Sequence, residues 1–377
     1  MNVDQHLWPE GDHWEPVEAR GTGEKPQLVL VFGSTERLSN PETLSRIRQA
    51  YPEAILAGCS TAGEIHGTGV HSGAISVTAL SFRHSAVKAV GAQIAHIEDS
   101  FAVGSQLGQQ LLADDLVHIV VFSDGLKVNG TELVKGLTGA LPEGVTVTGG
   151  LSGDGDRFAK TLVVHGETAR ENQITAVGFY GNRLRVGYGS MGGWDPFGPE
   201  RMITRSSGNV LYEVNGKSAL ALYKTYLGEH AEGLPGTGLL FPLSIRRKNE
   251  ENWLVRTILA ADEETQSLTF AGDVPEGARA RLMRANFDRL VDGAYSAAEI
   301  SNVEQQKSDF ALLISCVGRR MVLNWRVEDE IEAVREVFGS DTALAGFYSY
   351  GEISPFERNA VCELHNQTMT ITTFNEI

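Results

Sequence analysis

Three short segments of this chain combine glycine, hydroxyl and carboxylate groups in nearly the same order. They are residues 58–64, 149–154 and 346–352, and in each an acid lies five or six residues after a glycine. Such turns expose backbone N–H groups, while their hydroxyls and carboxylates can bind ammonium or guanidinium groups, so they could hold a small polar ligand. The candidate ligand-binding residues within them are Cys59, Ser60, Thr61, Gly63, Glu64, Ser152, Asp154, Tyr350 and Glu352.

A pair of arginines could add positive charge to this site. Arg319 and Arg320 follow the apolar run 311–318, and an arginine at a strand end can bind a carboxylate with two parallel hydrogen bonds. Because one of two adjacent arginines is usually solvated, we expect Arg319 rather than Arg320 to belong to the site. The alternative for all these groups is structural: the turns are simply tight, and their acids cap helices or pair with Arg319.

Nucleophilic catalysis has weaker support in the sequence. Cys59 and Ser60 stand in the first turn, but no GxSxG elbow surrounds them and no base lies at a spacing that ties it to either. Cys59 is also typical of a small buried residue at a strand end. We therefore expect a protein that is not an enzyme, and an enzyme using Cys59 or Ser60 as nucleophile is the alternative.

The histidines show no zinc pattern and no CxxCH site for covalent haem. A single histidine is nevertheless enough to ligate non-covalent haem. The candidates for such a ligand are His66, His71, His165 and His365. Ordinary hydrogen-bonded or surface histidines are the alternative at each of these positions.

The elements that position the three turns also recur. Each turn follows a strand, a helix and a second strand, and leads to a further strand. The first strands of the three units are expected at 28–32, 118–122 and 311–314, and the last at 74–80, 174–179 and 368–372. Helices are expected at 41–50, 101–112 and 131–140. This pattern predicts an α/β fold with mixed, largely antiparallel sheets, built from repeated strand-helix-strand-turn-strand units.

The domain organisation is suggested by glycine and proline. A loosely packed leader is expected at 1–25, ending in a glycine break, and the glycine-rich segment 188–198 resembles a hinge. This predicts two domains, at 26–198 and 199–377. Beyond the hinge, a hairpin-like pair of strands and a helix at 275–291 are expected.

Composition limits the possible partners. The 377 residues include 48 acids and 32 Lys+Arg, a net charge of −16, so nucleic acid and anionic membrane are poor partners. No apolar window of about 18 residues could span a bilayer, and the first residues do not form a signal peptide. The 3 cysteines are too few for a disulfide framework. The sequence predicts a cytoplasmic protein that binds neither nucleic acid nor membrane.

The first and third turns carry a resemblance. Residues 58–65, then 346–353 followed by 365–368, resemble the FIST family of bacterial sensory domains. Its N-terminal and C-terminal parts would cover nearly the whole chain after the leader. His365 and Asn366, in the last of these segments, complete the candidate ligand-binding residues.

The resemblance implies a cytoplasmic input domain that binds a small ligand, proposed to be an amino acid, and informs a signalling partner. Residues 192–198 and 208–213 look like the stand-alone members that include haem-binding nitric-oxide sensors. That branch implies haem b and a partner histidine kinase or cyclic-di-GMP enzyme. Because the chain has no kinase, receiver or GGDEF/EAL-like segment, the output would lie in a separate protein. A partner-binding module with an empty pocket is a further alternative.

Overall fold

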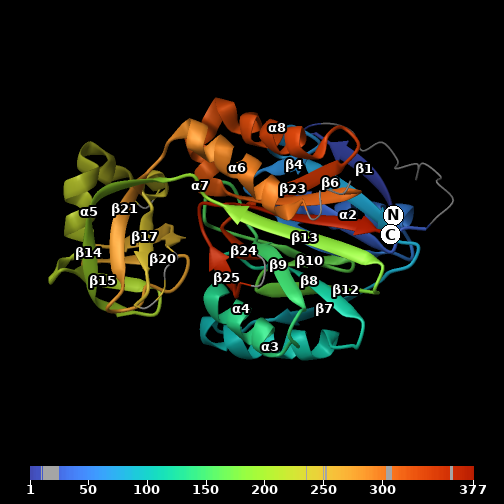
Figure 1. The fold of residues 1–377 in the computed structure, drawn as a ribbon, viewed down its shortest axis with the longest axis horizontal. Helices are drawn as coiled ribbons and strands as arrows, with labels where there is room; N and C mark the ends of the chain where they lie inside the picture. The colour runs from blue at the N-terminus through green and yellow to red at the C-terminus, as the bar shows by residue number, and fades with distance from the viewer. Residues whose placement is uncertain are drawn as a thin grey trace.

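The computed structural model describes residues 1–9, 11, 25–234, 236–248, 250, 253–302, 308–356 and 360–377. Figure 1 shows a large body of sheets flanked by helices and a smaller body, rich in strands, at its side. The smaller body is an insertion, because the chain leaves the large one after β13 (Leu184–Met191) and returns at α6 (Phe287–Ser301). The fold is α/β with mixed sheets, which confirms the predicted fold class.

The large body consists of three similar units, each with an edge strand, two parallel core strands, a hairpin and a closing strand. Unit 1 contains β1 (Asn2–Trp8), β2 (Leu28–Gly33), β3 (Ile55–Ser60), β4 (Glu64–His66), β5 (Gly69–His71) and β6 (Ile75–Ser81). Unit 2 contains β7 (Ala86–Gln93), β8 (Leu116–Ser123), β9 (Thr146–Leu151), β10 (Val163–His165), β11 (Thr168–Arg170) and β12 (Gln173–Tyr180). Unit 3 contains β13, β22 (Phe310–Cys316), β23 (Ala343–Ser349), β24 (Gly351–Pro355), β25 (Cys362–His365) and β26 (Met369–Glu376).

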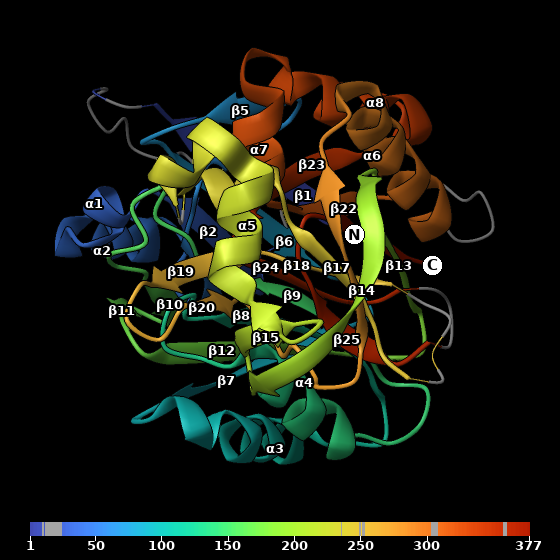
Figure 2. The ribbon, with the colours of Figure 1, turned by 90° about the vertical axis from the view of Figure 1, so that its left-hand side faces the viewer.

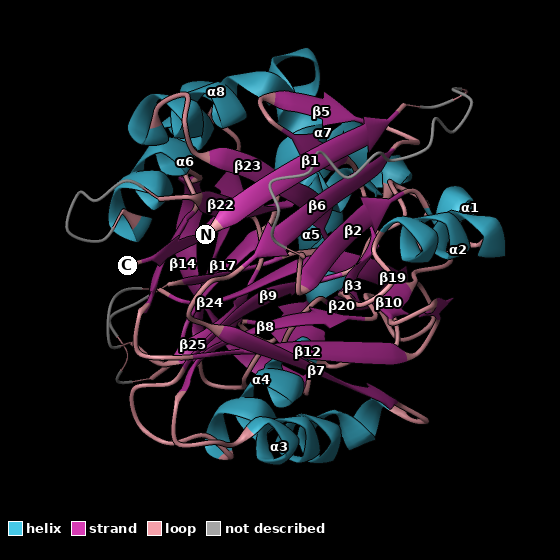
Figure 3. Cartoon of the chain, turned by 90° about the vertical axis from the view of Figure 1, so that its right-hand side faces the viewer, coloured by secondary structure: helices cyan, strands magenta, loops and turns pink. Residues whose placement is uncertain are grey.

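The helices lie in three groups around these strands, at the right side, the bottom and the top of the view in Figure 3. The groups are α1 (Thr35–Leu38) with α2 (Pro41–Ala50), α3 (Ser100–Leu111) with α4 (Gly130–Gly139), and α6 with α7 (Val317–Leu323) and α8 (Val327–Phe338). Asparagines start several of them. The side chains of Asn40, Asn129 and Asn286 accept backbone N–H groups of α2, α4 and α6, the usual role of an N-cap residue.

The units are joined by a cyclic exchange of hairpins. The hairpin β4–β5 of unit 1 pairs with β23 of unit 3, β10–β11 of unit 2 pairs with β3 of unit 1, and β24–β25 of unit 3 pairs with β9 of unit 2. The hairpins β4–β5 and β24–β25 directly follow the first and third glycine turns, and β10–β11 follows the second turn after the loop 155–162. The exchange therefore draws all three turns to one end of the large body.

One glycine in each unit is required by close strand packing. Gly58, Gly149 and Gly346 occupy the same register position in the parallel pairs β2–β3, β8–β9 and β22–β23. A Cβ atom at these glycines would lie 1.9, 2.0 and 1.7 Å from a carbonyl oxygen of the neighbouring strand. Gly58 and Gly149 also have φ angles of +147° and +151°, which L residues rarely adopt. The repeated glycines thus mark equivalent positions.

This register also corrects the alignment of the acids. Glu64 and Glu352 both lie six residues after their glycine and are equivalent, whereas Asp154 lies five residues after Gly149. The residue of unit 2 that is equivalent to Glu64 is Gly155. The second turn therefore departs from the other two.

Aromatic side chains from all three units meet between the sheets. The ring of Phe32 lies 5.7 Å from that of Phe122 and 4.9 Å from that of Phe347, centroid to centroid. All three are fully buried. Their burial contributes to a core shared by the units, as expected for parallel strands that are apolar on both faces.

The inserted body has its own hydrophobic core, which includes Ile203, Leu211 and Phe270. Figure 2 looks directly onto it. Its elements are β14 (Asp195–Ser207), β15 (Val210–Val214), β16 (Lys217–Ser218), α5 (Ala219–Leu227), β17 (Leu243–Arg246), β18 (Leu254–Arg256), β19 (Ile258–Asp262), β20 (Ser267–Phe270) and β21 (Arg279–Arg284). The helix expected at 275–291 is wrong: β21 pairs there with β14 and β17, and α6 begins only at Phe287.

The leader expected at 1–25 contains β1, the edge strand of the sheet that also holds β6, β2 and β3. Residues 2–8 form β1, which pairs with β6 along its whole length, and the N-terminal ammonium group lies 3.2 Å from a carboxylate oxygen of Asp309. Residues 10 and 12–24 lie outside the described part. The predicted boundary between 198 and 199 stays a prediction. None of the described helices is both long and apolar enough to cross a membrane.

Candidate functional site

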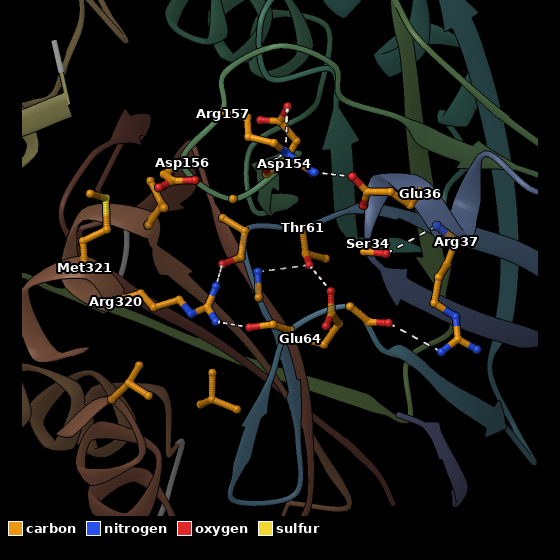
Figure 4. A pocket seen from close by; sticks show the side chains of 18 of the residues that line it. Ser34, Glu36, Arg37, Thr61, Glu64, Asp154, Asp156, Arg157, Arg320 and Met321 are labelled. Atoms are coloured by element: carbon orange, nitrogen blue, oxygen red, sulfur yellow. Dashed lines mark hydrogen bonds and ion pairs between the residues drawn. The ribbon is translucent and has the colours of Figure 1, made fainter. Parts of the chain in front are cut away.

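A cavity with a volume of about 1000 Å³ lies beside the first two turns. Its walls come from units 1 and 2 and from α7 of unit 3 (Figure 4). Most of its polar side chains are charged or carry hydroxyl groups. They are Ser34, Glu36, Arg37, Thr61, Glu64, Ser72, Asp154, Asp156, Arg157, Arg320 and Asn324.

The first turn presents a buried acid to this cavity. Glu64 is 1% exposed, and its carboxylate accepts hydrogen bonds from the Thr61 hydroxyl at 2.5 Å and the Ala74 backbone N–H at 3.1 Å. Burial outweighs these bonds and the nearby charge of Arg320, and raises the pKa of Glu64 to about 7. A carboxyl that titrates near neutral pH in a cavity is a feature typical of functional sites.

The second turn forms another wall. The carboxylate of Asp154 accepts hydrogen bonds from the backbone N–H groups of Ala159 and Lys160 at 3.0 and 2.9 Å, and from the hydroxyl of Tyr350. Arg157, three residues on, forms an ion pair with Glu36 from α1. These contacts fix the loop 154–160 against units 1 and 3.

Arg320 is the basic group that α7 contributes to the cavity. Its guanidinium donates to the Ala62 carbonyl and, at 2.6 Å, to the Ser72 hydroxyl, so it reaches the turn that carries Thr61 and Glu64 (Figure 4). Gly63 makes this approach possible, because a Cβ atom there would lie 2.8 Å from the guanidinium carbon. Among the described residues Arg320 forms no ion pair.

Arg319, which the sequence favoured, does not line the cavity. It is fully buried, and its guanidinium binds Glu330 at 2.7 and 3.0 Å and the backbone carbonyls of Gly192 and Leu290. Glu330 also accepts the hydroxyl of Tyr348 at 2.6 Å. Arg319 thus neutralises a buried acid and ties α7 to α6 and α8, a structural arrangement.

The third turn lies beside the other two but is closed to the cavity. Glu352 is fully buried and accepts hydrogen bonds from the Ser349 hydroxyl at 2.5 Å and from both the backbone N–H and the hydroxyl of Thr368 at 3.2 and 3.0 Å. Desolvation raises its pKa to about 8. Glu64 and Glu352 are thus both buried and hydrogen-bonded. A single cleft shared by all three acids is not formed, since only Glu64 and Asp154 line the cavity.

Asn366 connects the third turn to the inserted body, while His365 binds within the hairpin β24–β25. The Asn366 side chain donates to the Tyr350 carbonyl at 3.3 Å and accepts the Thr257 N–H at 3.4 Å. His365 binds the Ser354 carbonyl at 2.9 Å, and burial lowers its pKa to about 4. Both side chains are buried and neither lines the cavity.

The remaining candidates of the turns have structural partners. The Ser60 hydroxyl donates to the Gly153 carbonyl and accepts the Leu162 N–H, both at 2.8 Å, and the Ser152 hydroxyl donates to the Ser123 carbonyl at 2.9 Å. Cys59 is fully buried, and burial raises the pKa of its thiol well above the usual value. No base contacts either proposed nucleophile among the described residues.

The four histidines proposed as haem ligands do not meet at the large cavity, whose described lining contains no histidine. The ring of His66 binds the Ser76 hydroxyl at 3.0 Å and that of His365 binds a carbonyl. His71 lies in β5 opposite Glu64, and His165 is a half-buried residue of β10. A haem in this charged cavity would thus lack a histidine ligand and an apolar slot. The residues present do not fit haem there, and haem binding at another place stays a prediction.

Sequence reasoning missed the groups that enter the cavity from outside the repeated turns. Glu36 and Arg37 come from α1, Ser72 follows β5, and Arg320 and Asn324 come from α7 and the turn after it. A repeat-based search could have found the glutamate–arginine pair after β2, because it stands directly beyond a strand end. The choice between Arg319 and Arg320 depends on the direction of α7, which the sequence does not give.

Comparison with known proteins gives similarity along most of the chain. A model of the FIST N domain matches residues 27–217, and a model of the FIST C domain matches residues 219–355. The uncharacterized protein MJ1623 of Methanocaldococcus jannaschii is 22% identical in an alignment 346 residues long, which covers 85% of this chain and 65% of that protein. This chain therefore spans just under two thirds of the length of that curated relative.

Among solved structures, a crystal structure of cyanuric acid hydrolase from A. caulinodans is similar, with 8% identity and a TM-score of 0.36 over 100% of this chain and 99% of that one. This score is too low to bear on function. None of these similarities concerns haem or nitric oxide. The FIST N and FIST C matches together cover nearly all of the chain beyond its first residues, and the protein belongs to the FIST family of sensory, signalling-associated domains.

Proposed function

We propose that this protein is a non-catalytic sensory protein that binds a small polar ligand in the cavity between the first two turns and α7. The observation that carries the proposal is the guanidinium of Arg320, which faces the cavity and forms no ion pair among the described residues. A buried or half-buried arginine without an acidic partner favours an anionic group as its partner.

The charges around Arg320 favour a ligand with both signs. Asp156, exposed at the cavity wall, and Glu64 are available to an ammonium group. A carboxylate on Arg320 and an ammonium near these acids would be a free amino acid, the ligand class that the family resemblance implies. Output would pass to a separate signalling protein, such as a histidine kinase or cyclic-di-GMP enzyme. The occupied hydroxyl of Ser60 and the buried thiol of Cys59 support a role without covalent catalysis.

The proposal is tested by titrating the purified protein with the free amino acids one at a time and measuring binding by calorimetry. We expect saturable binding of one or a few of them. Arg320→Gln should weaken that binding about tenfold to a hundredfold, because a charge-assisted hydrogen bond contributes about 1.5–3 kcal/mol. Arg170→Gln, an exposed change on β11, is the matched control and should bind as the parent does.

Two results would contradict the proposal. Binding that is equal in the parent and in Arg320→Gln would remove Arg320 from the site. Absence of binding for every free amino acid, together with uptake of haem by the parent protein, would favour the haem-based alternative instead.

A further inference from the structure

A second cavity lies between unit 2 and the inserted body. Its volume is about 240 Å³. The loops 125–129 and 151–158 form the side from the large body, and β19 and β20 form the side from the inserted body. Figure 2 shows the inserted body, including β19 and β20, on the side of the large body that faces the viewer. Ligand cavities occur preferentially at such junctions between folded units.

The chemistry of this cavity is the opposite of that of the first. Its described lining contains no charged side chain. Six of the residues are apolar and of medium or large size: Ile97, Leu126, Val128, Leu151, Phe158 and Leu259. A charged ligand would lose its hydration here without an ionic partner. The lining therefore selects a neutral, mostly apolar molecule.

Asn209 offers an open hydrogen-bond acceptor in this lining. The Asn209 side chain donates through Nδ2 to the Phe270 carbonyl at 2.7 Å, and among the described residues its Oδ1 receives no donor. The other asparagine, Asn129, is already used: its Oδ1 accepts two N–H groups of α4, and its Nδ2 donates to Asp273. A neutral ligand with one N–H or O–H group would satisfy Asn209.

The two cavities share a wall. In the loop 154–160, Asp154 and Arg157 line the charged cavity and Phe158 lines the apolar one. The ring of Phe158 stacks on that of Tyr350, with centroids 4.4 Å apart, and the hydroxyl of Tyr350 binds Asp154. A molecule that contacts Phe158 would therefore affect Tyr350, which stacks on Phe158, and through the hydroxyl of Tyr350 the carboxylate of Asp154 in the first cavity.

We propose that the cavity at Phe158 and Asn209 is a second ligand site, for a small neutral aromatic molecule that carries one hydrogen-bond donor. Its volume suffices for such a molecule, since an engineered apolar cavity of about 150 Å³ admits benzene. The site does not depend on which ligand occupies the charged cavity. It gives the protein a second chemical input at the junction with the inserted body.

The test uses three related probes with the full chain. Indole is neutral and has one N–H donor, 1-methylindole lacks the donor, and indole-3-acetate adds a charge. We expect saturable binding of indole by calorimetry, about tenfold weaker binding of 1-methylindole because Asn209 stays unpaired, and no binding of indole-3-acetate at this site. Because this test compares three probes on the parent protein, it does not depend on whether a variant folds.

A filling substitution locates the site. Leu126→Trp places a larger side chain in the cavity and should abolish indole binding, whereas Arg320→Gln should leave it unchanged. The shared wall predicts that indole changes the hydrogen exchange of the Ala159 and Lys160 amides, which Asp154 holds. Absence of saturable indole binding, equal binding of indole and 1-methylindole, or full binding in a folded Leu126→Trp protein would each overturn the proposal. Unchanged exchange at Ala159 and Lys160 would overturn the link between the cavities.

Discussion

The buried carboxyl of Glu352 should make the stability of this protein fall as pH rises. Its pKa is about 8 in the folded protein against 4.5 for an ordinary glutamate, so between these values the folded state holds a proton that the unfolded state has released. The contribution of Glu352 to the free energy of unfolding is therefore fully present below about pH 4.5 and is lost as pH rises toward 8. The shift corresponds to about 5 kcal/mol in total, at about 1.4 kcal/mol per pH unit.

Glu352→Gln is the perturbation that isolates this effect. A glutamine resembles the protonated acid: its carbonyl can accept the two Thr368 donors, and its amide can donate to the Ser349 hydroxyl. We expect the variant to resemble the parent near pH 5 and to exceed it in unfolding free energy by roughly 4 kcal/mol near pH 8.

Urea denaturation at half-unit steps from pH 5 to 8.5 measures the difference, with the slope against urea compared at every pH to verify a constant unfolding reaction. Glu299→Gln, a change at an exposed position of α6, serves as the control and should follow the parent. Parallel pH profiles for the parent and Glu352→Gln would refute the reasoning.

Three further substitutions test the structural roles of single residues by thermal or urea unfolding. Gly58→Ala should lower the free energy of unfolding by about 3 kcal/mol or more, because its Cβ would lie 1.9 Å from a carbonyl oxygen at a φ of +147°. Gly139→Ala is the control and should not destabilise the protein, because a Cβ there would have nothing within 4 Å. Equal effects of the two substitutions would contradict the argument. Arg319→Met should cost about 3–5 kcal/mol by leaving a buried carboxylate unpaired, and a loss below 1 kcal/mol would count against it. Tyr350→Phe should cost about 1–3 kcal/mol by removing the hydroxyl that binds Asp154; an unchanged free energy of unfolding would show that this bond contributes nothing.

The sequence revealed the repeated unit because the unit is local. The alternation of apolar strands, the helices and the close-packed glycines Gly58, Gly149 and Gly346 all depend on neighbours within one unit. The cyclic exchange of hairpins was not visible, since a hairpin pairs equally well with its own unit or the next by local rules. The strand at 2–8 was missed because its partner β6 lies more than 60 residues away.

The burial of the acids could also be anticipated, whereas their access to a cavity could not. A carboxylate in a glycine turn requires hydrogen-bond donors wherever it is buried, and Glu64 and Glu352 both find a hydroxyl three residues earlier and a backbone N–H beyond. What differs is the surrounding structure. Glu64 lines the cavity beside Arg320, while Glu352 is fully buried and bound by Thr368.

The contrast between equivalent turns explains why the cavity lies at the first turn and not at the third. The inserted body enters only in unit 3, and the segment that closes over Glu352 is also the segment that holds that body: Asn366 binds Thr257, and Gln367 donates to the Leu239 carbonyl and the Thr257 hydroxyl. The third turn thus anchors the inserted body, and its carboxylate is closed to solvent. The first turn does not hold the inserted body, and its carboxyl lies beside the cavity. The proposed ligand site and the anchor of the inserted body are therefore built on two equivalent turns of the repeat. The repeat alone predicts neither role, because each role is decided by what packs on the turn from elsewhere in the chain.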